Sequence, residues 1–190
     1  MDTTMLRTSE SSGSDAEEPG SSTSGEVPPE PGRTRQPADS EDRIELDPEG
    51  LSEEAALQLR AGILEVLPLL PRSVERLGIR IVKDPEMTQI HDRWKHQPTT
   101  TDVVTFDLSD SSDGPMRVDV ALCLDEAERQ SKVRGHGVVD ELLLYVIHGL
   151  LHCCGHDDQD ETSSAAMHRE EDRLLQAIGR DPVYARGEES

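Results

Sequence analysis

The stretch that decides the fold is LLLYVIHGLLHCCGHDD, residues 142–158. It ends an apolar run with His148 and His152, four residues apart. On an α-helix two such imidazoles lie on one face and can reach one metal ion. Gly155 can end the helix in the left-handed conformation that glycine tolerates best. The chain then turns back, and three protein ligands with an open position are typical of catalytic zinc. The candidates for the third ligand are His156, Asp157 and Asp158.

This apolar run predicts a buried helix. It is too short to span a bilayer, which takes about 20 residues, and the two histidines interrupt it. A buried histidine must be hydrogen-bonded or ligated, since burying an unpaired polar group costs about 1–3 kcal/mol. Two histidines on one buried face, followed by polar residues, therefore favour a metal site. Imidazole and carboxylate ligands indicate zinc.

The composition fits one ordinary domain. The 190 residues carry a formal net charge of -21, from 40 acidic and 19 basic side chains. This charge argues against a generic polyanion-binding surface, although a local basic patch and a bound cation can still serve an RNA substrate. The three cysteines show no disulfide spacing, which fits a reducing cytosol. A basic start followed by an apolar core does not appear after Met1, so we predict no signal peptide.

Pattern and composition divide the chain into three parts. Residues 1–42 are rich in Ser, Gly, Pro and acids, and we predict a disordered acidic tail there. Residues 43–180 form the predicted domain, and residues 181–190 a flexible C-terminal tail. The domain is α+β, a small mixed sheet of about four strands covered by about five helices. Strands are predicted at 43–46, 74–82, 103–106 and 117–124, and helices at 52–69, 84–95, 125–133, 139–154 and 162–178.

The histidine spacing also resembles that of zinc peptidases, but one essential residue differs. Those enzymes place a glutamate next to the first histidine as general base. Here that position is Gly149, which has no side chain to accept a proton. A metallopeptidase is therefore a disfavoured alternative.

Several stretches together resemble one family. The pattern from His148 to Asp157 resembles the signature of the YbeY family, bacterial zinc-dependent endoribonucleases of ribosomal RNA maturation and ribosome quality control. Residues 101–106, 118–122 and 135–142 resemble further family motifs, in order, so that the likeness covers about residues 44–180. The resemblance implies a single-strand-specific endoribonuclease that processes the 3' end of 16S rRNA. It implies a cytoplasmic protein with one zinc ion, whose partners are RNA and ribosomal or small-subunit proteins, not DNA or a membrane.

The chain departs from the family at the site itself. Asp158 stands where the family has its third histidine ligand, and we expect it to complete the metal site with His148 and His152. His156, in the family's usual tyrosine position, is the alternative third ligand. An aspartate ligand lowers the charge of the site, which weakens the metal as a Lewis acid. Lys95 replaces the family's usual arginine, and the resemblance implies a catalytic role for it at the phosphate, beside His148 and His152.

Three weaker expectations complete the prediction. A local basic track for RNA could form on two helices, although a solvated helix face explains the same residues equally well: Arg93, Arg129, Lys132 and Arg134. Glu141 lies two turns before His148 on one helix face, so it could support a ligand. The runner-up function is a ribosome-assembly binding factor whose metal is mainly structural.

Overall fold

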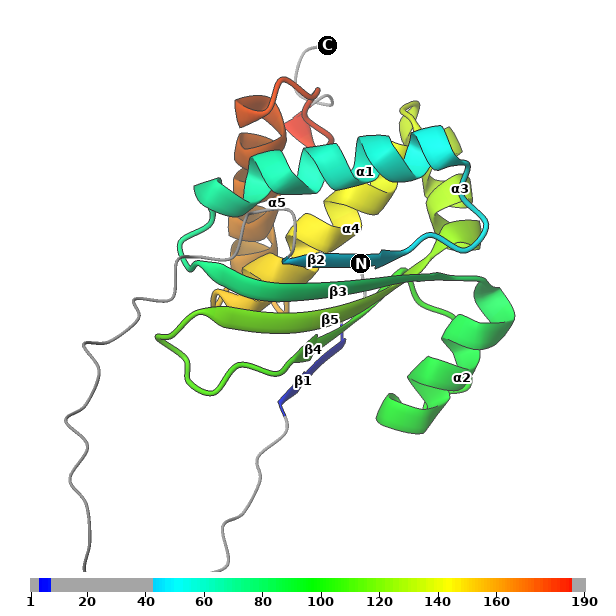
Figure 1. The fold of residues 1–190 in the computed structure, drawn as a ribbon, viewed down its shortest axis with the longest axis horizontal. Helices are drawn as coiled ribbons and strands as arrows, with labels where there is room; N and C mark the ends of the chain where they lie inside the picture. Colours follow the sequence, from blue (N-terminus) through cyan, green and yellow to red (C-terminus); the bar gives the residue numbers. More distant parts are fainter. Residues whose placement is uncertain (1–3, 8–42, 186–190) are drawn as a thin grey trace, which may run out of the picture.

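The computed structural model describes residues 4–7 and 43–185, and its centre is a five-stranded mixed sheet (Figure 1). The strand order is β1-β4-β5-β3-β2. β4 runs antiparallel to β5, and every other neighbouring pair is parallel. The strands are β1 (Thr4–Arg7), β2 (Ile44–Asp47), β3 (Val74–Val82), β4 (Val103–Asp107) and β5 (Met116–Cys123).

Five α-helices accompany the sheet, so the predicted α+β class is confirmed. They are α1 (Glu53–Val66), α2 (Asp84–Lys95), α3 (Leu124–Arg134), α4 (Val138–Cys153) and α5 (Glu161–Ala177). A short 3₁₀ helix at Leu67–Leu69 follows α1. The local signals act as expected: the Ser52 side chain accepts a hydrogen bond from the backbone N–H of Ala55 at the start of α1, and Pro85 lies in the first turn of α2.

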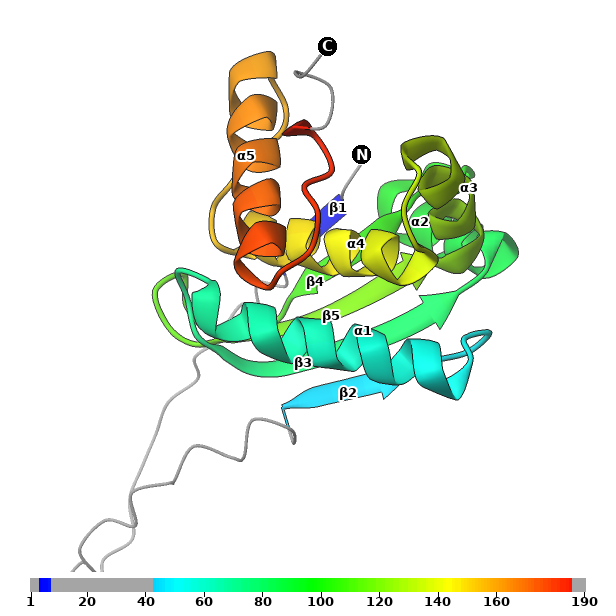
Figure 2. The same cartoon turned by 90° about the horizontal axis from the view of Figure 1, so that it is seen from above.

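The helices cover the two faces of the sheet unequally. α1 and α4 lie across one face, and α5 packs against the C-terminal part of α4 (Figures 1 and 2). α2 lies on the opposite face (Figure 1). α4 is predominantly apolar, and every residue from Glu141 to Cys153 is buried. A helix buried on all sides lies inside the core. This central position gives α4 a fixed place relative to β4, β5 and α5.

The structure describes a short segment of each predicted tail. Thr4–Arg7 forms β1 and pairs in parallel with β4, with Met5 opposite Thr105. Without β1, β4 would be an edge strand with unpaired backbone groups, which explains why a short segment can add there. The rest of the predicted N-terminal tail lies outside the described residues. At the other end, the backbone N–H groups of residues 183–185 donate to the buried carboxylate of Asp172, which holds this segment on α5.

Among the described helices, none is both long and apolar enough to cross a membrane.

Candidate metal centre

Three predicted ligands converge at the end of α4. The Nε2 atoms of His148 and His152 lie 3.3 Å apart. The carboxylate of Asp158 faces both rings, with Oδ2 at 3.6 Å from His148 Nε2 and Oδ1 at 3.7 Å from His152 Nε2. One ligand atom from each residue lies within 4.8 Å of the others. The group could therefore hold a metal ion.

The hydrogen bonds behind the two rings determine which ring atoms face the centre. His148 Nδ1 lies 2.5 Å from a carboxylate oxygen of Glu171, and His152 Nδ1 lies 3.0 Å from the backbone oxygen of His156. Both partners accept, so both Nδ1 atoms carry the proton. In a neutral ring the Nε2 atoms then present lone pairs. Burial, and then the neighbouring His148, lower the pKa of His152 and favour that neutral form.

The centre therefore consists of electron-pair donors alone. Two Nε2 lone pairs and a carboxylate face one another, and a hydrogen bond among them would need a proton that the two ring tautomers do not supply. Groups of this kind repel one another unless a cation lies between them. Two imidazoles and one carboxylate are also a common zinc donor set, so the residues present fit a metal.

Two glycines allow this arrangement. Gly155 has a φ of 95°, and with it the chain leaves α4 and turns back toward Asp158, as the sequence predicted. Gly149 lies against β4, and a Cβ atom there would approach Thr105 Oγ1 to 2.4 Å. Any side chain at position 149 would push α4 away from the sheet. The position cannot hold the glutamate of a zinc peptidase without such a shift.

A carboxylate that the sequence reasoning missed supports His148. Glu171 of α5 is fully buried and is the hydrogen-bond partner of the His148 ring. Glu141, which we considered for such a role, instead pairs with Arg134 and with the ring of His136. A signal for Glu171 was present, because it lies four residues after Met167 on the inner side of the amphipathic α5 and is buried there.

The other predicted site residues lie around or away from the centre. His156 contributes its backbone oxygen to the site, while the group of converging side chains contains Asp158. Lys95 is the last residue of α2, on the opposite face of the sheet from α4 (Figure 1). Its catalytic role stays a prediction. Cys153 is buried, and burial raises the pKa of the Cys154 thiol, which fits packing roles for both.

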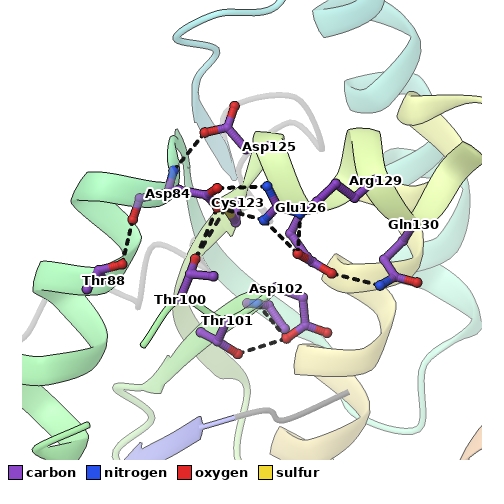
Figure 3. Close-up of polar contacts among 11 residues, drawn as sticks. Asp84, Thr88, Thr100, Thr101, Asp102, Cys123, Asp125, Glu126, Arg129 and Gln130 are labelled. Atoms are coloured by element: carbon purple, nitrogen blue, oxygen red, sulfur yellow. Dashed lines mark hydrogen bonds and ion pairs between the residues drawn. The ribbon is translucent and has the colours of Figure 1, made fainter. Parts of the chain in front are cut away.

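Part of the predicted basic track is engaged in ion pairs. Arg129 donates two hydrogen bonds, of 2.7 and 2.8 Å, to the carboxylate of Asp84 and a further hydrogen bond to Glu126 (Figure 3). The Arg129 guanidinium lowers the pKa of Asp84 to about 2. Arg134 pairs with the buried Glu141. These two arginines have structural partners, which favours the interpretation of α3 as a solvated and locally paired helix face.

The sequence matches a known protein family over this whole domain. The family model described as Endoribonuclease YbeY matches residues 43–179. The chain belongs to the YbeY family. A YbeY endoribonuclease of Synechococcus sp. (strain RCC307) is 33% identical over 149 residues, covering 70% of this chain and 93% of the relative. One from Renibacterium salmoninarum is 32% identical over 140 residues, covering 69% and 88%. The sequence resemblance to YbeY is thereby confirmed.

A solved structure shares the fold. The solution structure of a Thermotoga maritima protein superposes with a TM-score of 0.54 at 23% identity, covering 71% of this chain and 88% of that one. At this identity the likeness shows the fold alone. It agrees with the mixed sheet and the helical layers of this YbeY chain.

Proposed function

We propose that this chain is a zinc-dependent endoribonuclease that cleaves single-stranded RNA in the cytoplasm. Its substrate would be ribosomal RNA, at the 3' end of 16S rRNA, and it would serve ribosome quality control. One observation carries the proposal: a chain of the YbeY family directs the lone pairs of His148 and His152 and the carboxylate of Asp158 to one point. The ribosomal setting follows from the family resemblance.

The donor set favours zinc and leaves room for chemistry. Two imidazoles and a carboxylate are three protein ligands, which leave a fourth position for a water or a phosphate oxygen. A zinc ion held by these three residues would supply a bound water of lowered pKa and would polarise a phosphodiester. His148 and His152 hold their Nε2 lone pairs toward the ion through the bonds at Nδ1. Asp158 adds a negative charge, so the site should be a weaker Lewis acid than one with three histidines.

The approach of RNA to so acidic a chain needs local positive charge. The last turn of α2 carries Arg93 and Lys95, and between them Trp94 is 43% exposed. The Arg93 guanidinium lies 5.7 Å from the centre of the Trp94 ring. Cationic side chains beside an exposed aromatic ring suit a single strand, because phosphates pair with the cations and bases stack on the ring. The catalytic role that we expect for Lys95 would require the RNA to reach both this element and the metal centre, because α2 and α4 lie on opposite faces of the sheet.

A second candidate function is a ribosome-assembly binding factor with a mainly structural metal. The charge of Asp158 favours it, since a weaker Lewis acid suits holding a fold better than cleaving RNA. A peptidase is disfavoured by the contact between position 149 and Thr105.

RNA cleavage by a panel of variants tests the proposal. Wild type, His148→Ala and Asp158→Ala would be incubated with labelled single-stranded RNA, its duplex and the same sequence as DNA. His96→Asn is the matched control, because His96 is exposed at a φ of 55°, which asparagine tolerates. We expect wild type and the control to cut only the single-stranded RNA. Undiminished cleavage by both ligand variants would contradict metal catalysis, and a metal-loaded wild type without cleavage would favour the binding factor.

A further inference from the structure

Glu171 is a buried carboxylate of α5 that contacts His148. Its side chain is fully inaccessible, and Oε1 accepts the hydrogen bond from His148 Nδ1. Its other oxygen, Oε2, is buried and has no hydrogen-bond partner among the described residues. A buried charge with so few partners costs several kcal/mol unless an opposite charge lies close by. A bound cation or a proton close to Glu171 would therefore stabilise this arrangement.

The other described neighbours of Glu171 offer it little positive charge. His168 lies three residues before Glu171 on the same helix, and burial lowers the pKa of the His168 ring, which disfavours a positive charge there. Tyr184 stacks on His168 from the C-terminal segment, and burial raises the pKa of its hydroxyl. Arg134 lies over the Tyr184 ring, yet its guanidinium pairs with Glu141.

The remaining neighbour is the metal centre itself. His148 links Glu171 to the point where the two Nε2 atoms and Asp158 meet. A divalent ion there would balance the two negative charges of Asp158 and Glu171, and the site would be neutral. A carboxylate behind a histidine ligand also fixes the ring tautomer and makes the ligand more basic.

We infer that Glu171 is a positioning residue of the metal centre. It holds His148 with the Nε2 lone pair toward the ion, and a divalent cation there would lie next to its buried carboxylate. The inference rests on the metal site of the proposed function. It makes metal affinity depend on a residue of α5 that does not touch the ion.

Substitution by glutamine separates positioning from structural support. Glu171→Gln keeps the shape and an acceptor for His148 Nδ1 but removes the charge. Glu170→Gln is the matched control, because the neighbouring Glu170 pairs with Arg173 at the surface. The full-length proteins would be titrated with Co²⁺ against a competing chelator, with the visible cobalt spectrum as signal. The thermal midpoint would be measured without metal and with Zn²⁺.

We expect Glu171→Gln to bind Co²⁺ about 10–100-fold more weakly than wild type, with a changed spectrum, and Glu170→Gln to bind within twofold. The gain in thermal midpoint on adding Zn²⁺ should be smaller for Glu171→Gln than for wild type. Unchanged Co²⁺ affinity would overturn the inference. So would an equal fall of both midpoints, or failure of both Glu171→Gln and Glu171→Asp to fold without metal, since the role would then be structural.

The outcomes are separable from those for the proposed function. If wild type cleaves RNA while Glu171→Gln binds Co²⁺ normally, the positioning role fails and the nuclease stands. If the affinity falls as expected but wild type leaves RNA intact, the positioning role stands and the nuclease fails.

Discussion

Replacing Gly149 by alanine tests how closely α4 must approach the sheet to place its two histidines. A Cβ atom at position 149 would lie 2.4 Å from Thr105 Oγ1, and Thr105 is itself buried on β4. Both partners sit on rigid elements, so the contact cannot be relieved by a flexible side-chain end. Overpacking of this kind costs about 1–3 kcal/mol. Helix propensity favours alanine over glycine by about 1 kcal/mol, which offsets part of that cost.

These two effects predict that Gly149→Ala destabilises the wild-type protein but stabilises a protein that already carries Thr105→Ala. Gly149→Ala alone should lower the free energy of unfolding by up to about 2 kcal/mol. Thr105→Ala removes the clashing hydroxyl, which has no hydrogen-bond partner in the described chain, and leaves only a Cβ atom at 3.5 Å. In that background Gly149→Ala should raise the free energy of unfolding by up to about 1 kcal/mol. The coupling between the two sites should then be about 1–3 kcal/mol.

The coupling comes directly from urea unfolding of wild type, the two single variants Gly149→Ala and Thr105→Ala, and the double variant. The Co²⁺ affinity of the same proteins reports whether the histidines have moved. Gly62→Ala is a matched control, because its Cβ would meet only the end of the flexible Leu143 side chain, at 2.9 Å. It should be close to neutral. A Gly149→Ala protein more stable than wild type, or a coupling below about 0.5 kcal/mol, would refute the reasoning about this contact.

Three further predictions concern acid stability, the C-terminal segment and the third ligand. Arg129 lowers the pKa of Asp84 to about 2, so this pair should stabilise the fold above pH 4 and lose that effect as the pH falls toward 2; urea unfolding should show a weaker acid dependence in Asp84→Asn. Asp172→Ala should free the backbone N–H groups of residues 183–185, lower the unfolding free energy by about 1–3 kcal/mol and speed proteolysis of this segment. His156→Ala should keep the cobalt spectrum of wild type, because His156 contributes only its backbone oxygen; a changed spectrum would make its ring a ligand.

Local signals in the sequence were sufficient for most of the fold. The strand at Val74–Val82 and the helix at Asp84–Lys95 begin and end where the alternation and the Asp-Pro-Glu start predict. The apolar run through His148 gave the buried helix, and Gly155 gave its end. Each of these depends on neighbours within a few residues. Such features can be predicted from one chain.

Features that depend on distant partners could not be predicted. Glu171 meets His148 across 23 positions of sequence, and nothing near either residue specifies the pairing. β1 forms because it pairs with the edge of β4, about a hundred residues away in the sequence. The segment Thr4–Arg7 is too short for its own pattern to predict a strand. The ion pairs of the α3 arginines could not be predicted, because acidic partners such as Asp84 lie on other elements. Tertiary contacts between residues far apart in the sequence, rather than local propensity, determine these three features.

The central claim is that His148, His152 and Asp158 hold a metal ion that RNA cleavage requires. The most direct measurement strips the full-length protein with a chelator and follows cleavage of single-stranded RNA while Zn²⁺ is added back, for wild type and Asp158→Asn. The account predicts that stripped wild type is inactive, that about one equivalent of Zn²⁺ restores it, and that Asp158→Asn, with one charged ligand fewer, needs more than ten times as much metal. Full cleavage by the stripped protein, or identical Zn²⁺ requirements for the two proteins, would contradict it.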